Sequence, residues 1–164
     1  MENEYLSDTI LIIGLGSPIM TDDAIGLEVA QSIEDKCLPD IETRQEAIGG
    51  LDIIPVLWGY RHVIIVDAIQ TGQYEPGTVL IFNPEDFDPT ITNASAHDIN
   101  LATAMKIGRD MEPEKMPESV MFVAVEVEDI QTMHEGMTPK VAASVDKAVE
   151  AVLHLANSFK DRSD

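Results

Sequence analysis

Three runs of apolar, β-prone residues constrain the fold of this chain more than any other feature. They are TILIIGL (9–15), HVIIVDA (62–68) and VMFVAVEV (120–127). Runs that are apolar at nearly every position are typical of strands buried on both faces, as in a parallel sheet covered by helices. The chain must therefore supply helices to both sides of these strands.

Helical patterns occupy much of the sequence between the three runs. From Asp23 to about Lys36, apolar residues recur four positions apart at Ile25, Val29 and Ile33, which is the spacing of one helix face. The other predicted elements in the first half are a short strand at 40–46, a helical stretch from Gly49-Gly50 through Leu57 and a strand at 78–83. An irregular segment at 84–96 then leads to a helix that is capped by Ser95 and runs to about Arg109. The last helix has Thr138 as N-cap, Pro139 at its first position and a core-facing stripe of Val141, Val145, Val149, Val152 and Ala156.

Alternating buried strands and helices predict the α/β class. The 164 residues are enough for one domain with a substantial core. We therefore expect a single domain over residues 1–164, with its core at about 9–158 and a central, mostly parallel, twisted sheet that carries helices on both faces.

The charge of the chain restricts its partners. Thirty acidic and ten basic side chains give a formal net charge of −20, which repels nucleic acids and anionic membranes and favours cationic partners or metal ions. The single cysteine, Cys37, excludes an internal disulfide and is expected to be a buried small residue. The acidic start and the absence of a long apolar stretch predict a cytoplasmic protein with no membrane span.

The segment GLGSPIMTDDAIG (14–26) joins the first strand to the first helix. Its opening Gly-x-Gly resembles a phosphate-binding loop, but Ile19 replaces the third glycine and Pro18 removes an N–H group. Asp22 and Asp23 would also repel a pyrophosphate. The turn is therefore better suited to a cation than to a dinucleotide.

Three potential metal ligands are predicted to meet at one edge of the sheet. Asp23 follows the first strand, Asp67 closes the second buried run, and His97 lies in the first turn of the helix capped by Ser95. Ligands of such folds bind beyond the carboxyl ends of the strands. Two carboxylates and a neutral imidazole suit nickel, zinc and similar ions, and three protein ligands leave positions open for substrate. Of the pair Asp22 and Asp23, we expect one to cap the helix.

The remaining candidate groups are expected to be structural. His62 starts a buried strand, His154 is predicted to face solvent on the last helix, and His134 is expected to lie outside the site. The sequence contains neither a G-x-S-x-G nucleophile motif nor an H-E-x-x-H zinc motif. A hydrolase with this sequence would therefore not use one of these familiar activated groups.

The order and spacing of four motifs resemble the [NiFe]-hydrogenase maturation endopeptidases. The motifs are GLGSPIMTDDAIG, HVIIVDA, SAHDINL and HEGMTP, and the likeness extends from about Ile10 to Ala156. The resemblance implies an enzyme of the aspartyl-type endopeptidase class, in which Asp23 and Asp67 are catalytic and Asp23, Asp67 and His97 contact the metal. Ser17 departs from the asparagine that is usual in the family at this position.

The resemblance also implies a substrate and a metal. The family removes a C-terminal extension from the precursor of the hydrogenase large subunit after nickel insertion, so nickel would be supplied by the substrate. We further expect a monomer. Two alternatives remain open from the residues alone: a phospho-acceptor receiver-like domain, for which the required lysine at the end of a late strand is missing, and a non-enzymatic metal-binding maturation chaperone.

Overall fold

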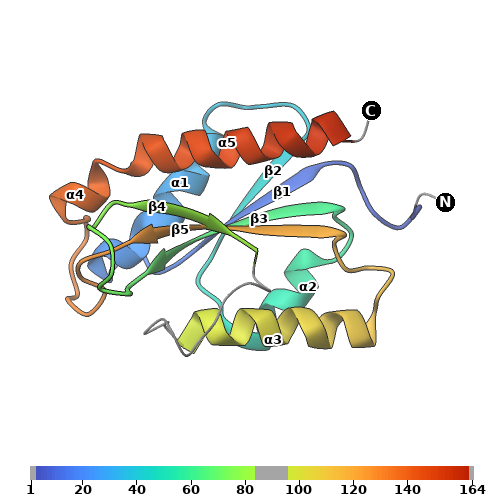
Figure 1. Cartoon of the computed structure of the whole chain (residues 1–164), viewed down its shortest axis with the longest axis horizontal. Helices are drawn as coiled ribbons and strands as arrows, with labels where there is room; N and C mark the ends of the chain where they lie inside the picture. Colours follow the sequence, from blue (N-terminus) through green and yellow to red (C-terminus); the bar gives the residue numbers. More distant parts are fainter. Residues whose placement is uncertain (1–2, 84–95, 163–164) are drawn as a thin grey trace.

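A computed structural model shows one central five-stranded sheet with the strand order β2-β1-β3-β5-β4 (Figure 1). It describes residues 3–83 and 96–162, and the side chains of these residues except 96–100. Four strands are parallel, and the edge strand β4 runs antiparallel to β5. The strands are β1 (Ile10–Leu15), β2 (Ile41–Glu46), β3 (His62–Ile69), β4 (Val79–Phe82) and β5 (Ser119–Glu126). The predicted α/β class and the mostly parallel sheet are confirmed.

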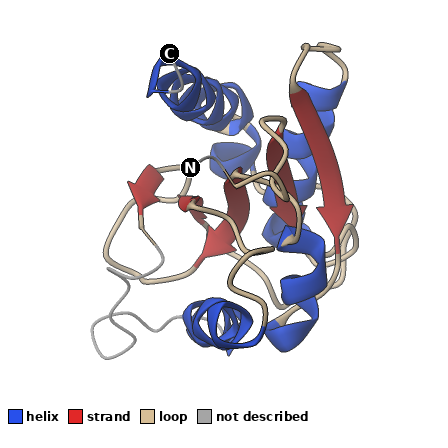
Figure 2. Cartoon of the chain, turned by 90° about the vertical axis from the view of Figure 1, so that its right-hand side faces the viewer, coloured by secondary structure: helices blue, strands red, loops and turns tan. Residues whose placement is uncertain are grey.

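Helices cover both faces of the sheet (Figures 1 and 2). The helices α1 (Ile25–Glu34) and α5 (Val145–Arg162) cover one face, while α2 (Ile54–Leu57) and α3 (Ala96–Met111) cover the other. The strands β1, β3 and β5 are buried on both sides because their apolar residues alternate between the two layers. In β3, Ile64 and Val66 pack toward α1 and α5, whereas Val63 and Ile65 pack toward α2 and α3.

The strand order creates a crevice between β1 and β3. From β1 the chain reaches β2 through the helix α1 on one face of the sheet. From β2 it returns to β3 through a 3-10 turn, η2 (Gly50–Ile53), and α2 on the other face. The chain proceeds from β1 outward to β2 on one side and from β3 outward to β4 and β5 on the other, so the strand order reverses between β1 and β3. Ligands bind at such a reversal, beyond the carboxyl ends of the strands.

The first helix lies against the sheet backbone without a side chain between them. A Cβ atom on Gly26 would lie 2.3 Å from the carbonyl oxygen of Leu15 and 2.5 Å from that of Val66. A Cβ atom on Gly14 would lie 2.1 Å from the carbonyl oxygen of Gly26. Only glycine fits at these two positions, so the start of α1 is fixed against β1 and β3 by backbone contacts.

Two expectations from the sequence were wrong. The last helix starts with Thr138 as N-cap and Pro139 at its first position, as predicted, but it is interrupted at 143–144. There the Ser144 N–H and the Ser144 hydroxyl both donate to the Val141 carbonyl oxygen, at 3.0 and 2.6 Å, in place of the regular helical bond. A short α4 (Pro139–Ala142) therefore precedes α5. Cys37 is exposed rather than buried, since it lies in the turn after α1 with a left-handed backbone (φ 49°) that directs the chain toward β2.

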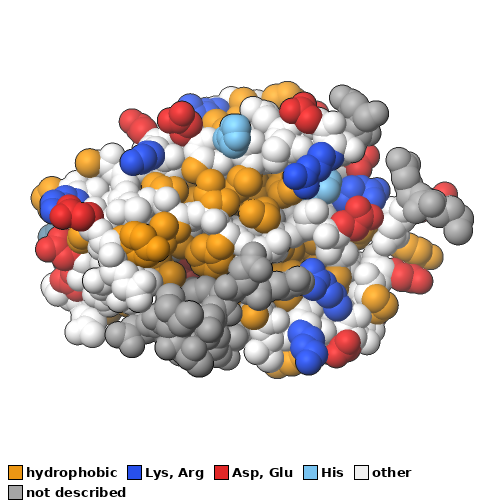
Figure 3. Space-filling view, viewed as in Figure 1, with side chains coloured by type: hydrophobic (Ala, Val, Ile, Leu, Met, Phe, Trp, Pro, Cys, Tyr) orange, Lys and Arg blue, Asp and Glu red, His pale blue; other side chains and the backbone are white. Residues whose placement is uncertain are grey.

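The surface on the β4 side carries hydrophobic side chains over β4 and the adjacent flank of α5 (Figure 3). Tyr74, before β4, and Ile81, within it, are 47% and 46% exposed. Among the described residues, no helix combines the length and apolar character that crossing a bilayer requires. The predicted irregular segment 84–96 and the Ser95 cap lie almost entirely outside the described residues.

Candidate active site

Asp23 lies in a 3-10 turn, η1 (Thr21–Ala24), between β1 and α1. Gly16 allows the preceding loop to pass directly against this turn: its φ is +151°, and a Cβ atom there would lie 1.9 Å from the carbonyl oxygen of Asp23. The Gly-x-Gly of the sequence therefore serves close backbone packing at the turn. The Asp23 side chain remains half-buried at the carboxyl end of the sheet.

Asp67 reaches the same edge from β3. Asp67 lies two residues after Ile65 and four after Val63 in the same strand, so the three side chains point to the same face of the sheet, which α2 and α3 cover. The residue is 6% exposed, and its carboxylate oxygen Oδ1 accepts a hydrogen bond from the Ala68 N–H at 2.8 Å. This contact fixes the orientation of a carboxylate that is almost completely buried.

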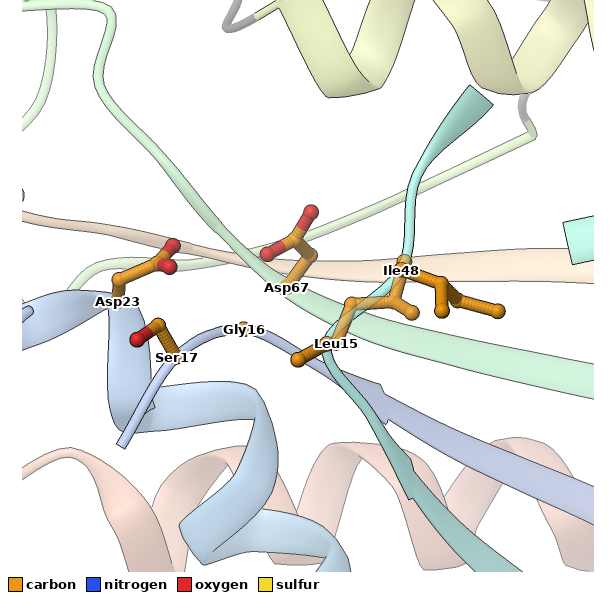
Figure 4. Close-up of a pocket in the computed structure, with 7 residues that line it drawn as sticks. Leu15, Gly16, Ser17, Asp23, Ile48 and Asp67 are labelled. Carbon is orange, nitrogen blue, oxygen red and sulfur yellow. The ribbon is translucent and has the colours of Figure 1, made fainter. Parts of the chain in front are cut away.

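The two carboxylates line one cavity of about 140 Å³ between the carboxyl ends of β1 and β3. Figure 4 shows the Asp23 carboxylate directed toward Asp67 from the η1 side. The structure therefore brings together the two acids that the sequence predicts, although they are separated by a strand and two helices in the chain. The lining residues are Leu15, Gly16, Ser17, Asp23, Ala47, Ile48 and Asp67.

The third predicted ligand, His97, is placed only by its backbone. It belongs to the first turn of α3, and α3 begins at the end of the molecule where the parallel strands end (Figure 1). Its side chain lies outside the described residues. Within the part of the chain that is described, no three His, Cys, Asp or Glu side chains form a metal-binding group, so a metal site here depends on His97 or on ligands from the substrate.

Asp22 does not cap the first helix, although the sequence predicts that either Asp22 or Asp23 does. Its side chain is completely buried and accepts hydrogen bonds from the N–H groups of Glu128 (3.0 Å), Asp129 (2.9 Å) and Thr138 (2.7 Å). The Thr138 hydroxyl also donates to Asp22 at 2.9 Å. Neither Asp22 nor Asp23 caps α1, whose N-cap is Ala24. Asp22 instead fixes the segment before α4 to the η1 turn.

The other histidines lie outside the cavity, as the sequence predicts. His62 stacks on Phe159, with ring centroids 4.6 Å apart, and burial lowers the pKa of its imidazole below the usual value. His154 is exposed on α5. His134 is also exposed, and its Nδ1 lies 3.2 Å from the Gly136 carbonyl oxygen.

Comparison with known proteins identifies the family of the chain. Residues 48–155 match the hydrogenase maturation protease family. The chain is 32% identical over 147 residues to the hydrogenase 2 maturation protease of Escherichia coli strain K12, with 88% of each chain covered.

Two solved structures are similar over nearly the whole chain. The hydrogenase maturating endopeptidase HybD from E. coli has a TM-score of 0.75 at 26% identity, covering 91% of this chain and 92% of the other. An endopeptidase from Escherichia coli solved in solution has a TM-score of 0.74 at 30% identity, covering 88% and 90%. The family match, the curated relative and the shared fold together establish that this chain belongs to the hydrogenase maturation proteases.

Proposed function

We propose that this endopeptidase removes the C-terminal extension from the precursor of a [NiFe]-hydrogenase large subunit after nickel has been inserted. In this proposal Asp23, Asp67 and His97 bind the nickel that the substrate already carries. The observation that supports it is the cavity at the β1–β3 crevice, into which two separate elements of a hydrogenase maturation protease bring Asp23 and Asp67.

The donor set suits a metal ion that arrives with the substrate. Carboxylate oxygens and an imidazole nitrogen are acceptable ligands for nickel. Three protein ligands leave coordination positions for groups of the precursor. Nickel is thus part of the substrate. The enzyme distinguishes the loaded precursor from the unloaded one because only the loaded precursor carries a metal ion that Asp23, Asp67 and His97 can bind.

The two aspartates are also the proposed catalytic groups. Both carboxylates line the cavity, and the Ala68 N–H fixes that of Asp67. A carboxylate positioned in this way can orient a water molecule or take its proton during peptide hydrolysis. A nickel ion between the carboxylates and the precursor would hold the scissile peptide at the same place, and it can polarise the carbonyl group.

Membership in a protease family favours this function over the two alternatives. A receiver-like domain needs a lysine at the end of a late strand, where β5 instead ends at Glu126. Glu126 is 1% exposed and accepts hydrogen bonds from the N–H and hydroxyl groups of Thr71. A metal-binding chaperone would not require a peptidase fold.

The test compares two forms of one precursor. Purified enzyme is incubated with nickel-loaded and with nickel-free large-subunit precursor, and the intact masses of the products are measured. We expect the loaded form to lose a C-terminal peptide and the nickel-free form to stay intact, with cleavage restored by reloading. Equal cleavage of both forms would eliminate recognition through nickel, and cleavage of neither would contradict the proposed substrate.

We further propose that the enzyme acts in the cytoplasm and as a monomer, since a formal net charge of −20 disfavours association between identical copies. Sedimentation at micromolar concentration tests the monomer.

A further inference from the structure

Two large hydrophobic side chains are exposed beside the η1 turn. Met133 is 75% exposed and Ile19 is 44% exposed. Met133 belongs to the β5–α4 loop (128–138), and Ile19 belongs to the loop between β1 and η1. Exposed hydrophobic residues that lie together mark interaction sites, whereas single ones are common on any surface.

Backbone pairing places the two residues next to each other. Met20 forms an isolated parallel bridge with His134. The His134 N–H donates to the Ile19 carbonyl oxygen at 2.9 Å, and the Thr21 N–H donates to the His134 carbonyl oxygen at 3.1 Å. In this register Ile19 is the neighbour of Met133. The backbone thus brings two exposed apolar residues, far apart in the sequence, to neighbouring positions of one surface.

The β5–α4 loop is held firmly in this position. The buried Asp22 carboxylate accepts three N–H groups and one hydroxyl group from it. The Thr21 hydroxyl donates to the Thr132 carbonyl oxygen at 2.5 Å, next to Met133. The structure thus uses a buried carboxylate to fix the backbone of a loop from which the Met133 side chain extends into solvent. A loop with a fixed backbone binds a partner at a lower entropy cost than a mobile loop.

The pair is continuous with the candidate active site. Ile19 lies on the loop between Ser17 and Asp23, and both of these residues line the cavity. A partner whose scissile segment enters the cavity would therefore contact Ile19 and Met133 with its neighbouring surface.

The surroundings of the pair are acidic. Glu128 and Glu135 are exposed within the loop. Hydrogen bonds from the side chain and N–H of Thr132 and from the Gln131 N–H lower the pKa of Asp129, so this carboxylate stays ionised. An apolar centre with an acidic rim fits a partner that presents an apolar side chain flanked by lysine or arginine.

We propose that Ile19 and Met133 form the apolar centre of a docking surface for the hydrogenase precursor. The occupant is the surface of the precursor that adjoins its scissile segment, with an apolar side chain between basic residues. This inference rests on the proposed function for the identity of the partner. It adds a contact that does not involve nickel, so the nickel-free precursor also binds here without being cleaved.

The experiment separates docking from cleavage. Binding of nickel-free precursor to the full-length enzyme is measured by biolayer interferometry, and processing of nickel-loaded precursor is measured as KM and kcat. Met133→Ser and Ile19→Ser are expected to raise both Kd and KM about tenfold, the loss typical of one central interface side chain, and to leave kcat unchanged. Met111→Ser is the matched control, because Met111 is 66% exposed at the far end of α3.

Several outcomes would overturn the inference. Unchanged Kd and KM in both variants would do so, as would an equal effect of Met111→Ser or a wild-type enzyme that does not bind nickel-free precursor. Wild-type dimerisation that Met133→Ser abolishes, with Kd for the precursor unchanged, would assign the surface to a second copy of the chain. Failure of wild-type cleavage with intact docking would contradict the proposed function and leave the docking surface supported.

Discussion

Asp22 and Asp23 are adjacent in the chain, yet their carboxylates have opposite surroundings. Asp22 is completely buried and accepts hydrogen bonds from the segment before α4. Asp23 lines the cavity together with Asp67. The two neighbours thus have different places in the structure: Asp22 fixes the turn and the loop next to it, and Asp23 leaves its carboxylate in the cavity.

Asp22→Asn should reduce stability. An amide in place of the carboxylate presents an NH2 group to donors such as the Thr138 N–H, which leaves buried donors unsatisfied and costs about 2 to 3 kcal/mol. Urea denaturation followed by circular dichroism measures the free energy of unfolding. Asp110→Asn, an exposed substitution on α3, is the control and should change stability by less than about 0.5 kcal/mol. Equal effects of the two substitutions would refute the role of Asp22.

Asp23→Asn and Asp67→Asn should each abolish processing of nickel-loaded precursor. Each substitution removes a negative charge from the cavity with little change in shape, so the circular dichroism spectrum should stay that of the wild type. His97→Ala is expected to give the same result on the basis of the sequence. Mass spectrometry of the precursor measures processing, and a variant that loses its spectrum would show that the residue is structural.

Gly26→Ala should be far more harmful than alanine at a glycine with open space around it, such as Gly72. The new Cβ atom would overlap the carbonyl oxygens of Leu15 and Val66, at 2.3 and 2.5 Å, and backbone atoms cannot move aside as a flexible side chain can. We expect a loss of about 3 kcal/mol or more. Gly72→Ala is the comparison: it has no neighbour within 4 Å but a φ of +71°, so it should cost about 1 to 2 kcal/mol. Thermal unfolding of both variants tests this order.

His62 should make stability depend on pH near neutrality. Burial is the main reason why the pKa of its imidazole lies below the usual histidine value of about 6.5. The unfolded chain therefore binds this proton more readily, so the contribution of His62 to stability is complete above about pH 7 and decreases as the pH falls through 6.5. His62→Phe, which keeps a ring against Phe159, should flatten the dependence between pH 7.5 and 5.5. An identical slope in both proteins would contradict this origin.

The buried strands and the position of Asp67 could be predicted from the sequence because both depend on local patterns. Apolar runs specify β1, β3 and β5, and strands that end at a common edge bring Asp23 and Asp67 together. The partners of Asp22 could not be predicted, since they lie 106 to 116 residues away in the chain. The interruption before α5 involves the hydroxyl of Ser144, and the exposure of Cys37 follows from the turn after α1. Hydrophobic periodicity predicts neither.

The contact of Gly26 with the carbonyl groups of Leu15 and Val66 has a consequence for how the enzyme selects its substrate. Backbone atoms in direct contact have no rotamers, so the position of Asp23 relative to β3 is set when the protein folds. The binding of a substrate therefore does not include the entropy cost of bringing Asp23 and Asp67 together. In the proposed function, carboxylates that are already in place would leave the enzyme to discriminate by what the precursor delivers to them, its nickel.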